Sequence, residues 1–227
     1  MRKGNRPPSV GDREYYPVYL DLTGRRAVVV GGGKVAERKI LSLLSAGAKV
    51  VVISPELTSR LEEERQKETL THIARVYRRG DIKDAFLVVA ATDSPEVNKQ
   101  VAAHAPALVN VVDVPSQCNF IAPSVVKRGP LQLAISTGGV SPAFARTVRM
   151  ELEDSYGREF PSYLRFLKTI RAKALAGLEA GKEREAFLKY VASPEMLTLL
   201  RSQGLAEVKK RVHEAFHSAA VRSERAK

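Results

Sequence analysis

The first half of the chain alternates short β-branched hydrophobic runs with polar stretches that keep apolar residues at helical spacing. Between Arg26 and Val112 these runs are "RAVVVG", "AKVVVIS", "HIARVY", "FLVVAA" and "LVNVV". The stretches "KVAERKILSLLSAG" and "SPEVNKQVAAHA" have the spacing of amphipathic helices. Strands that alternate with helices predict a parallel sheet covered on both faces, which is an α/β fold.

The second half changes pattern. Two short strand-like runs, "SVV" and "LQLAIS", flank "KRGP" and predict a β-hairpin. Ser141 and Pro142 have the pattern of a helix start. Beyond Tyr156 the spacing is helical to the end of the chain, with predicted interruptions near Gly181, Pro194 and Gly204.

The strongest local motif is a glycine turn between the first strand and the first helix. "GGGKVA" has the form G-x-G-x-x-A, in which Gly31 permits a tight turn and Gly33 lets the backbone approach a pyrophosphate. Ala36 allows the helix to pack closely on the strand, and the helix N-terminus offers N–H groups to phosphate. This context predicts a Rossmann-like dinucleotide site.

The residue that binds the adenosine ribose is less clearly marked. An acidic residue is expected about 20 residues after the glycines, and Glu56 lies near that distance. A carboxylate there favours NAD over NADP. Arg60 is close enough to keep NADP open, and the alternative role of Glu56 is a solvated residue in the first turn of a helix.

Polar residues follow the last two strands of the predicted sheet. Thr92 and Asp93 end one strand, while Asn110 and Asp113 lie at the end of the next. Ligands of open α/β sheets bind beyond these carboxyl ends. Asp93 also has the position of a helix cap, whereas "VPSQCNF" after Asp113 does not begin a helix. We therefore expect Asp113 to serve a ligand.

Composition restricts the class of protein but does not identify a partner. The 227 residues are 44% hydrophobic and contain one cysteine, which fits a globular protein of a reducing cytoplasm. No run is long enough to span a membrane, and the start has no signal-peptide pattern. The net charge is +12, and residues 158–227 hold 15 Lys and Arg against 8 Asp and Glu. This balance suggests a polyanionic partner, or a solvated basic surface.

One further motif is set aside. "HEAFH", from His213 to His217, matches the zinc-binding pattern H-E-x-x-H. No third ligand follows it, and the strand-rich half has no other protease-like feature. We interpret it as a chance occurrence on an amphipathic helix and expect no metal site.

Several segments together resemble the precorrin-2 dehydrogenase family, whose fold also forms the N-terminal part of siroheme synthases. They are "YYPVYLDLTGRRAVVVGGGKVAERK", "AATDSPEVN" and "NVVDVPSQCNFIAPSVVKRGPLQLAISTGGVSP", within about residues 15–153. The last 70 residues match less distinctively. They end far short of the methyltransferase domain of fused members, so we expect no methylation activity.

The resemblance implies NAD-dependent oxidation of precorrin-2, a tetrapyrrole with eight carboxylates, to sirohydrochlorin. It implies a homodimer, and some relatives also insert ferrous iron into the product. Asp113 matches the key aspartate of the family and would accept the proton. The residues that it places at the cofactor are Lys34, Val35, Pro55 and Glu56. The residues that it places beside the tetrapyrrole cleft are Ser136, Thr137 and Gly138, and Thr137 matches a phosphorylated serine of one relative.

The predicted architecture is a Rossmann-like parallel sheet, a small α+β dimerisation segment and a helical C-terminal region. The corresponding ranges are residues 1–113 for NAD binding, 114–145 for dimerisation and 146–227 for the helices. Two other function classes stay open at this point: an NAD-sensing module without catalysis, and a nucleic-acid-binding protein that uses the basic tail. The chain has no Trp and no RNA-binding signature, which argues against the second. A short-chain dehydrogenase would need Tyr-x-x-x-Lys, which is missing.

Overall fold

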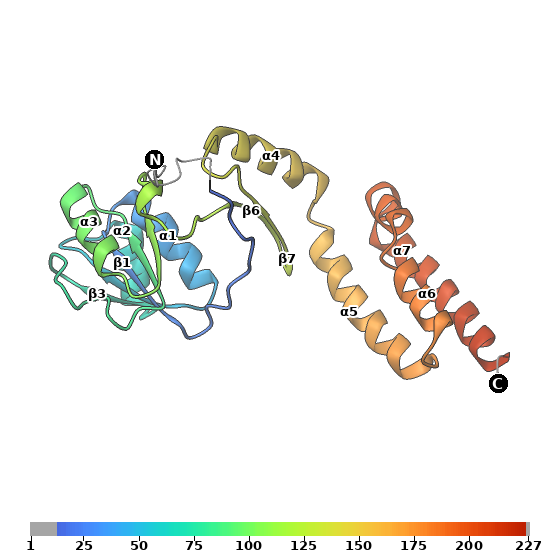
Figure 1. Cartoon of the computed structure of the whole chain (residues 1–227). Helices are drawn as coiled ribbons and strands as arrows, with labels where there is room; N and C mark the ends of the chain where they lie inside the picture. The colour runs from blue at the N-terminus through green and yellow to red at the C-terminus, as the bar shows by residue number, and fades with distance from the viewer. Residues whose placement is uncertain (1–12, 226–227) are drawn as a thin grey trace, which may run out of the picture. The chain divides into compact units, whose positions relative to one another are not determined.

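The computed structural model describes residues 13–225. Five parallel strands form one sheet in the order β3-β2-β1-β4-β5, with β1 at its centre (Figure 1). Their bounds are β1 Arg26–Val30, β2 Lys49–Ile53, β3 Leu70–Ile73, β4 Leu87–Ala90 and β5 Leu108–Val111. The strand order reverses between β1 and β4, so a crevice opens there at the carboxyl ends of the strands.

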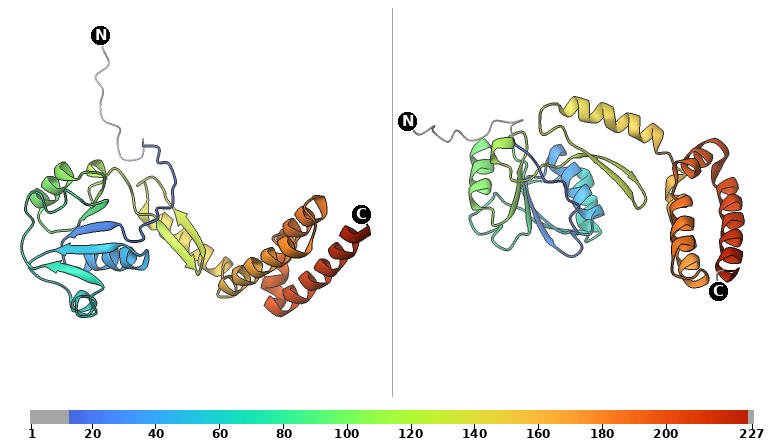
Figure 2. Two further views of the ribbon diagram at one scale, coloured as in Figure 1. Left: turned by 90° about the horizontal axis from the view of Figure 1, so that it is seen from below. Right: turned by 45° about the vertical axis from the view of Figure 1, so that its right-hand side comes forward.

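Helices cover both faces of the sheet. Helices α1, Lys34–Ser45, and α2, Ser59–Gln66, lie on one face, and α3, Pro95–His104, lies on the other (Figures 1 and 2). Side chains of β1 and β4 are buried on both sides, which explains their continuous apolar sequences. Ala36 and Ile40 anchor α1 in one core, while Val101 anchors α3 in the other.

Two local predictions need correction. The strand expected within "HIARVY" is β3, and it ends at Ile73. The chain turns there, because the Arg75 N–H donates to the Ile73 carbonyl and the Arg75 side chain pairs with Asp81. "VPSQCNF" was expected to contain no helix, yet Pro115–Gln117 forms one 3₁₀ turn, η1.

The rest of the chain forms the predicted hairpin and helices. Strands β6, Ser124–Arg128, and β7, Leu131–Ile135, pair antiparallel. The helices are α4 Pro142–Ser155, α5 Phe160–Gly177, α6 Lys182–Tyr190 and α7 Pro194–Arg225. The chain breaks at the predicted glycines, since Gly181 has φ 152° and Gly204 interrupts α7 with φ 80°. Helices α5, α6 and α7 share one apolar core.

Contacts group the described chain into two units. The first contains the parallel sheet through residue 123 and residues 137–142, and the second contains residues 124–136 and the helices from residue 143 onward. The division at residues 113 and 145 expected from the sequence stays a prediction. Within residues 13–225, none of the helices is long and apolar enough to cross a membrane.

Candidate functional site

The three glycines of the turn after β1 have different surroundings. Gly31 has φ 120°, and a Cβ on it would overlap the carbonyl group of Ala91. A Cβ on Gly32 would overlap the carbonyl oxygen of Glu56. Gly33 has an ordinary extended backbone, φ −80° and ψ −175°, and a Cβ there would have no atom within 4 Å. The fold therefore requires glycine at Gly31 and Gly32, while Gly33 leaves open space for a ligand.

The helix that follows supplies hydrogen-bond donors to that space. The Glu37 N–H donates to the Gly33 carbonyl at 2.9 Å, which is the first bond of α1. The N–H groups of Lys34, Val35 and Ala36 precede it and have no acceptor within the helix. Gly33 caps the helix without a side chain. An open approach and free N–H groups at the positive end of a helix fit a pyrophosphate.

A cavity of about 630 Å³ lies over the carboxyl ends of the strands. Its lining comes from the ends of β1 and β2, from the turns that follow β1, β2, β3 and β4, and from α3: Val30–Gly33, Ile53–Thr58, Val76, Tyr77, Ala91–Ser94 and Val97. This volume suits a cofactor of dinucleotide class. Gly31, Gly33, Pro55, Glu56, Thr92 and Asp93, which the sequence placed at the cofactor, all line it. Lys34, Val35, Asn110 and Asp113 are not among its lining residues.

Glu56 lies in the turn after β2. It is exposed, and it lines the cavity as the ribose-binding prediction requires. Its alternative role in the first turn of a helix is wrong, because α2 begins only at Ser59, with Thr58 as its N-cap. The buried Ser54 hydroxyl donates to the Glu56 carbonyl and fixes this turn.

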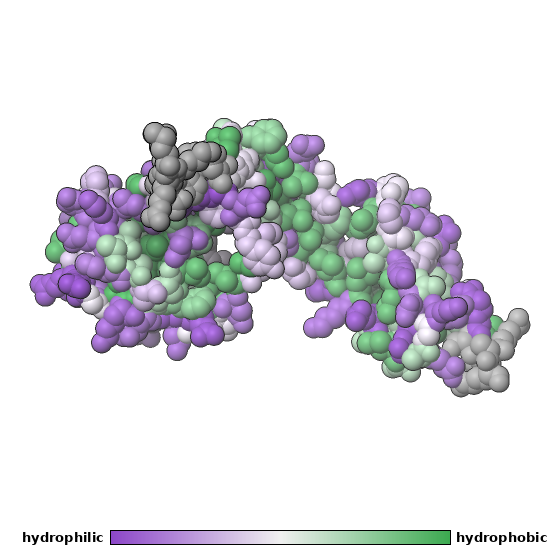
Figure 3. Space-filling view, in the orientation of Figure 1, coloured by the Kyte–Doolittle hydropathy of each residue, from purple (hydrophilic) through white to green (hydrophobic). Residues whose placement is uncertain are grey.

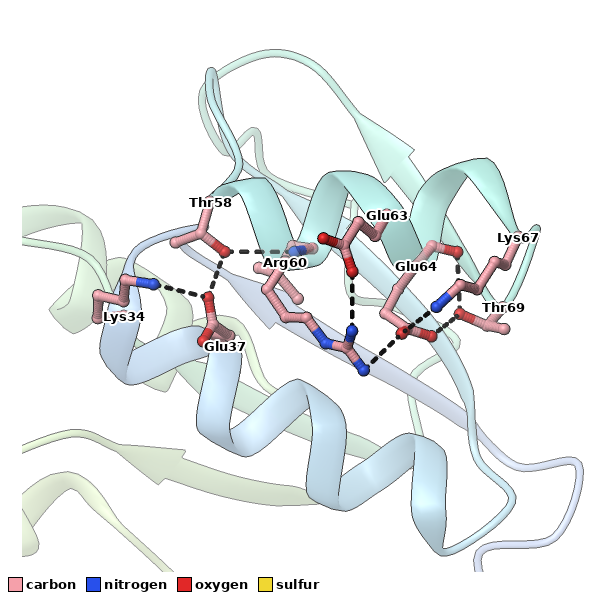
Figure 4. A network of polar contacts seen from close by, with 9 residues as sticks. Lys34, Glu37, Thr58, Arg60, Glu63, Glu64, Lys67 and Thr69 are labelled. Carbon is pink, nitrogen blue, oxygen red and sulfur yellow. Dashed lines mark hydrogen bonds and ion pairs between the residues drawn. The ribbon is translucent and has the colours of Figure 1, made fainter.

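A network of polar side chains joins α1 to α2 (Figure 4). The Thr58 hydroxyl donates to the Glu37 carboxylate at 2.5 Å, and Lys34 Nζ lies 3.3 Å from the same oxygen. The Thr58 hydrogen bond, together with Lys34, holds the pKa of Glu37 below its usual value. The network therefore connects the glycine turn to the turn that carries Glu56.

Arg60, the residue that left NADP binding possible on sequence grounds, forms ion pairs on α2. Its Nη1 lies 2.8 Å from Glu63 and its Nη2 lies 3.2 Å from Glu64, both on the same helix (Figure 4). These two carboxylates compete with a 2′-phosphate for the guanidinium.

The turn after β4 places Thr92 and Asp93 at the cavity. The Thr92 hydroxyl donates to Asn98 Oδ1 at 2.8 Å, and Asn98 Nδ2 returns a bond to the Thr92 carbonyl at 2.9 Å. The predicted helix-cap role of Asp93 is wrong, because the Ser94 hydroxyl accepts the bond from the Val97 N–H. Asp93 is exposed, and its carboxylate is not needed as the cap of α3.

Asp113 lies in the turn after β5, and β5 is the strand that pairs with β4. It is exposed and has φ 60°, the left-handed conformation that Asp and Asn adopt more readily than other non-glycine residues. The Val114 N–H donates back to the Val111 carbonyl at 3.3 Å and closes the turn. The backbone conformation therefore turns the chain sharply at Asp113.

The surroundings of this turn are partly basic. Arg13 donates to the carbonyl oxygens of Cys118 at 3.1 Å and Pro115 at 3.4 Å. Burial lowers the pKa of Lys39 on α1, while the nearby Asp113 carboxylate opposes that effect. Burial raises the pKa of the Cys118 thiol, which accepts a hydrogen bond from the Val111 N–H. Cys118 therefore stays a neutral structural residue.

Asn110 is the penultimate residue of β5, and its side chain forms a hydrogen bond within the protein. Its side-chain Nδ2 donates to the Phe120 carbonyl at 3.2 Å, which ties β5 to the segment that follows η1. Its contact with the cofactor stays a prediction, which these bonds do not favour.

The predicted cleft residues Ser136, Thr137 and Gly138 follow β7 directly. The Thr137 hydroxyl donates to the Ser141 carbonyl and accepts from the Ser141 N–H, both at 3.1 Å. Gly138 has φ 63°. These bonds fix the turn that enters α4. A role of the three residues beside a tetrapyrrole stays a prediction.

Part of the cavity wall was not expected from the sequence. Val76 and Tyr77 come from the β3–β4 connection, and Val97 comes from α3. Thr58 could have been found, since it is a helix-capping residue type before the helical stretch "SRLEEERQ". Val76 and Tyr77 were expected to lie within a strand, because the strand in "HIARVY" was predicted to extend beyond Ile73.

The histidine motif "HEAFH" lies on α7. There His213 packs edge-on against Phe166, and residues 13–225 contain no cluster of three potential metal ligands.

The parallel sheet, glycine turn and cavity define a dinucleotide-binding α/β protein with an additional hairpin and helical unit. A family described as "Putative NAD(P)-binding" matches residues 18–124. A second, described as "Sirohaem biosynthesis protein central", matches residues 128–155. The predicted nicotinamide cofactor is thereby confirmed.

Curated relatives include two siroheme synthases. That of Methylobacillus flagellatus is 38% identical over 177 residues, which are 77% of this chain and 38% of the relative. That of Nitrosococcus oceani is 41% identical over 174 residues, which are 74% of this chain and 37% of the relative. The chain thus spans well under half the length of these relatives.

A solved structure covers the chain more completely. SirC, described as precorrin-2 dehydrogenase, superimposes with a TM-score of 0.74 at 30% identity, covering 88% of this chain and 100% of SirC. The chain therefore belongs to the family shared by precorrin-2 dehydrogenases and siroheme synthases. The predicted family and fold class are confirmed.

Proposed function

We propose that the protein oxidises precorrin-2 to sirohydrochlorin with NAD. The observation that carries this proposal is the shared fold over the full length of a solved precorrin-2 dehydrogenase. The cavity at the glycine turn supports it, because the turn leaves room for a pyrophosphate that only glycine allows. A merely NAD-sensing module, the alternative, would not need Asp113.

The reaction removes two hydrogens from the macrocycle, one as a hydride and one as a proton. The bound nicotinamide supplies the hydride acceptor. We assign the proton to Asp113, whose exposed carboxylate follows the strand beside β4. The turn gives the residue a left-handed backbone and leaves the carboxylate free of any helix-capping duty. In this role the carboxylate is the general base of the proposed reaction.

The charge of the protein is consistent with this substrate. Precorrin-2 carries eight carboxylates, and the chain has a formal net charge of +12. Opposite charges raise the rate at which a ligand and a protein meet. We therefore assign the basic balance to a small polyanion, without invoking nucleic acid.

The test is anaerobic turnover of precorrin-2 with NAD, followed by absorbance. Asp113→Asn keeps the left-handed backbone at low cost and removes only the charge. We expect turnover to fall by about 10²-fold or more, the usual loss for a general base. NAD affinity should stay at the parent value, because the glycine turn lies on another strand. Turnover of this variant at the parent rate would refute the base assignment.

A second variant separates the effect of losing the Asp113 charge from the effect of backbone strain at this position. Asp113→Ala adds about 1 kcal/mol of left-handed strain that Asn avoids. Equal turnover losses in both variants, with lower stability only in Asp113→Ala, assign the catalytic effect to the carboxylate. Failure of the parent protein itself to oxidise precorrin-2, with NAD bound, would leave the sensing module as the function.

Two partners belong to the same proposal. Ferrous iron is a candidate second substrate, and adding it to the turnover assay reports whether sirohydrochlorin is converted further. A homodimer is supported by the exposed apolar side chains of α4, among them Phe144 at 60% and Met150 at 52% exposure. Figure 3 shows hydrophobic residues at the surface along this helix.

A further inference from the structure

The connection between β3 and β4 forms a wall of the cavity that is apolar but uncovered. Val76 and Tyr77 both line the cavity. Val76 is 62% exposed, although it is a large hydrophobic residue in a concave site. Such a side chain gains stability when a flat apolar surface covers it. The wall therefore has the chemistry of a contact for an aromatic ring.

The position of this wall next to the ribose site indicates that the aromatic ring is the adenine base of the cofactor. The glycine turn after β1 takes the pyrophosphate, and Glu56 after β2 lies where the adenosine ribose is bound. Strand β3 is the next strand outward from β2, on the side away from β4 and β5. The base attached to that ribose therefore extends toward the turn after β3, which carries Val76 and Tyr77.

A charged pair holds this turn in place. Arg75 Nη1 and Nη2 donate to the two carboxylate oxygens of Asp81, each at 2.8 Å. The Asp81 side chain is only 12% exposed, and it also accepts from the Arg78 N–H at 2.8 Å. Val76 and Tyr77 lie between these residues in the sequence. Two parallel bonds fix both the distance and the plane of the pair.

Further bonds connect the turn to the body of the unit. Arg75 Nη1 donates to the Val76 carbonyl at 3.0 Å, and Arg26 Nη2 donates to the Asp81 carbonyl at 3.2 Å. The Tyr77 hydroxyl lies 3.0 Å from His104 Nδ1 at the end of α3. The wall is thus held from the sheet on one side and from α3 on the other.

We propose that Val76 and Tyr77 form the adenine contact of the cofactor, and that Asp81 is a positioning residue that holds this contact through Arg75. The inference rests on cofactor binding alone, so it can fail while precorrin-2 oxidation stands. Asp81 touches no reacting atom. Its effect is confined to the adenosine half of the cofactor.

The experiment measures binding of AMP, NAD and nicotinamide mononucleotide by calorimetry, with the full-length protein. We expect Asp81→Asn to weaken AMP and NAD about tenfold, because one of the two parallel bonds is lost and the turn is released. Nicotinamide mononucleotide, which has no adenosine, should bind as it does to the parent. In turnover, the KM for NAD should rise while kcat at saturating NAD stays constant.

Two further variants provide a control and a separate test of the apolar contact. Asp84→Asn changes an exposed carboxylate on the same connection and should alter nothing. Val76→Ser leaves the charged pair intact and should weaken AMP about threefold to tenfold, since apolar contact is lost. Parent-like AMP affinity in either Asp81→Asn or Val76→Ser would overturn the proposal. An equal loss of nicotinamide mononucleotide binding would also overturn it, because the effect would then reach beyond the adenosine half.

Discussion

The glycine turn assigns separate tasks to adjacent residues. Gly31 and Gly32 lie against the carbonyl groups of Ala91 and Glu56, so they allow the turns after β1, β2 and β4 to approach one another. Gly33 has no such neighbour. Its small size is therefore explained by a ligand and not by the fold, which makes the three positions separable by mutation.

We predict that Gly33→Val folds normally and loses NAD affinity by at least about tenfold, or 1.4 kcal/mol. The backbone at Gly33 suits any residue, but a side chain would occupy the space for the pyrophosphate. Calorimetry with NAD and a thermal melt measure the two properties. Gly32→Ala is the matched control, and we expect it to lower stability by about 1–3 kcal/mol through overpacking. Parent-like NAD affinity in Gly33→Val would place the pyrophosphate elsewhere.

A second prediction at this scale concerns acid stability. The Arg75 guanidinium holds the pKa of Asp81 below its usual value of 3.8. Folding therefore favours the ionised carboxylate, and this contribution is present above pH 3.8 and lost as the pH falls through the lower folded-state value. We expect Asp81→Asn to be about 2 kcal/mol less stable than the parent at neutral pH.

The difference between the two proteins should shrink at pH 3, because below pH 3.8 the Asp81 carboxylate is protonated in the unfolded parent before it is protonated in the folded parent. Urea unfolding followed by circular dichroism at both pH values measures it. A stability difference that is constant with pH would mean that the pair contributes through shape and not through charge.

At the scale of elements, the polar contacts of α1 and α2 bear on the choice between NAD and NADP. Thr58 bonds to Glu37 across the two helices, and Arg60 is engaged along α2 by Glu63 and Glu64. The adenosine side of the cavity thus presents the exposed Glu56 without a free arginine on α2. A 2′-phosphate would meet negative charge there.

We therefore predict that NAD outperforms NADP by about tenfold or more in kcat/KM. Glu56→Gln removes the repulsion and should narrow this ratio, mainly through better use of NADP. Steady-state kinetics with both cofactors give the answer. Equal efficiency with NADP in the parent would mean that a cation other than Arg60 controls this end of the cavity.

At the scale of the whole molecule, the exposed face of α4 supports association with a second copy. The helix has 14 residues, of which only Ala145 is buried, while Phe144 and Met150 are exposed. Exposed large apolar side chains on one helix are typical of a surface that a partner covers.

We predict that Phe144→Glu shifts the protein from dimer to monomer. A charge buried at an apolar interface without a partner costs several kcal/mol. Analytical ultracentrifugation measures the mass, and NAD calorimetry checks that the sheet unit stays intact. Glu151→Gln, on the same helix but without apolar contact to lose, serves as the control. A parent protein that is monomeric at micromolar concentration would contradict the dimer.

The sequence by itself determined the features that a few neighbouring residues encode. Continuous β-branched runs predicted the buried parallel strands, "KRGP" predicted the β6–β7 hairpin, and the glycine turn predicted the cofactor. The breaks at Gly181 and Gly204 followed from the backbone freedom of glycine. In each case the determining interactions lie within one turn or one period of the chain.

Only the tertiary structure decided which of several possible partners each polar side chain takes. Arg75 pairs with Asp81 and ends β3 early, which brings Val76 and Tyr77 to the cavity. Asn110 bonds to the Phe120 carbonyl, and the Glu37 carboxylate is shared by Lys34 and Thr58. Any of these side chains could have bound a ligand on sequence grounds. Which partner it takes depends on the elements that pack beside it, since hydrogen bonds form only over a few ångströms.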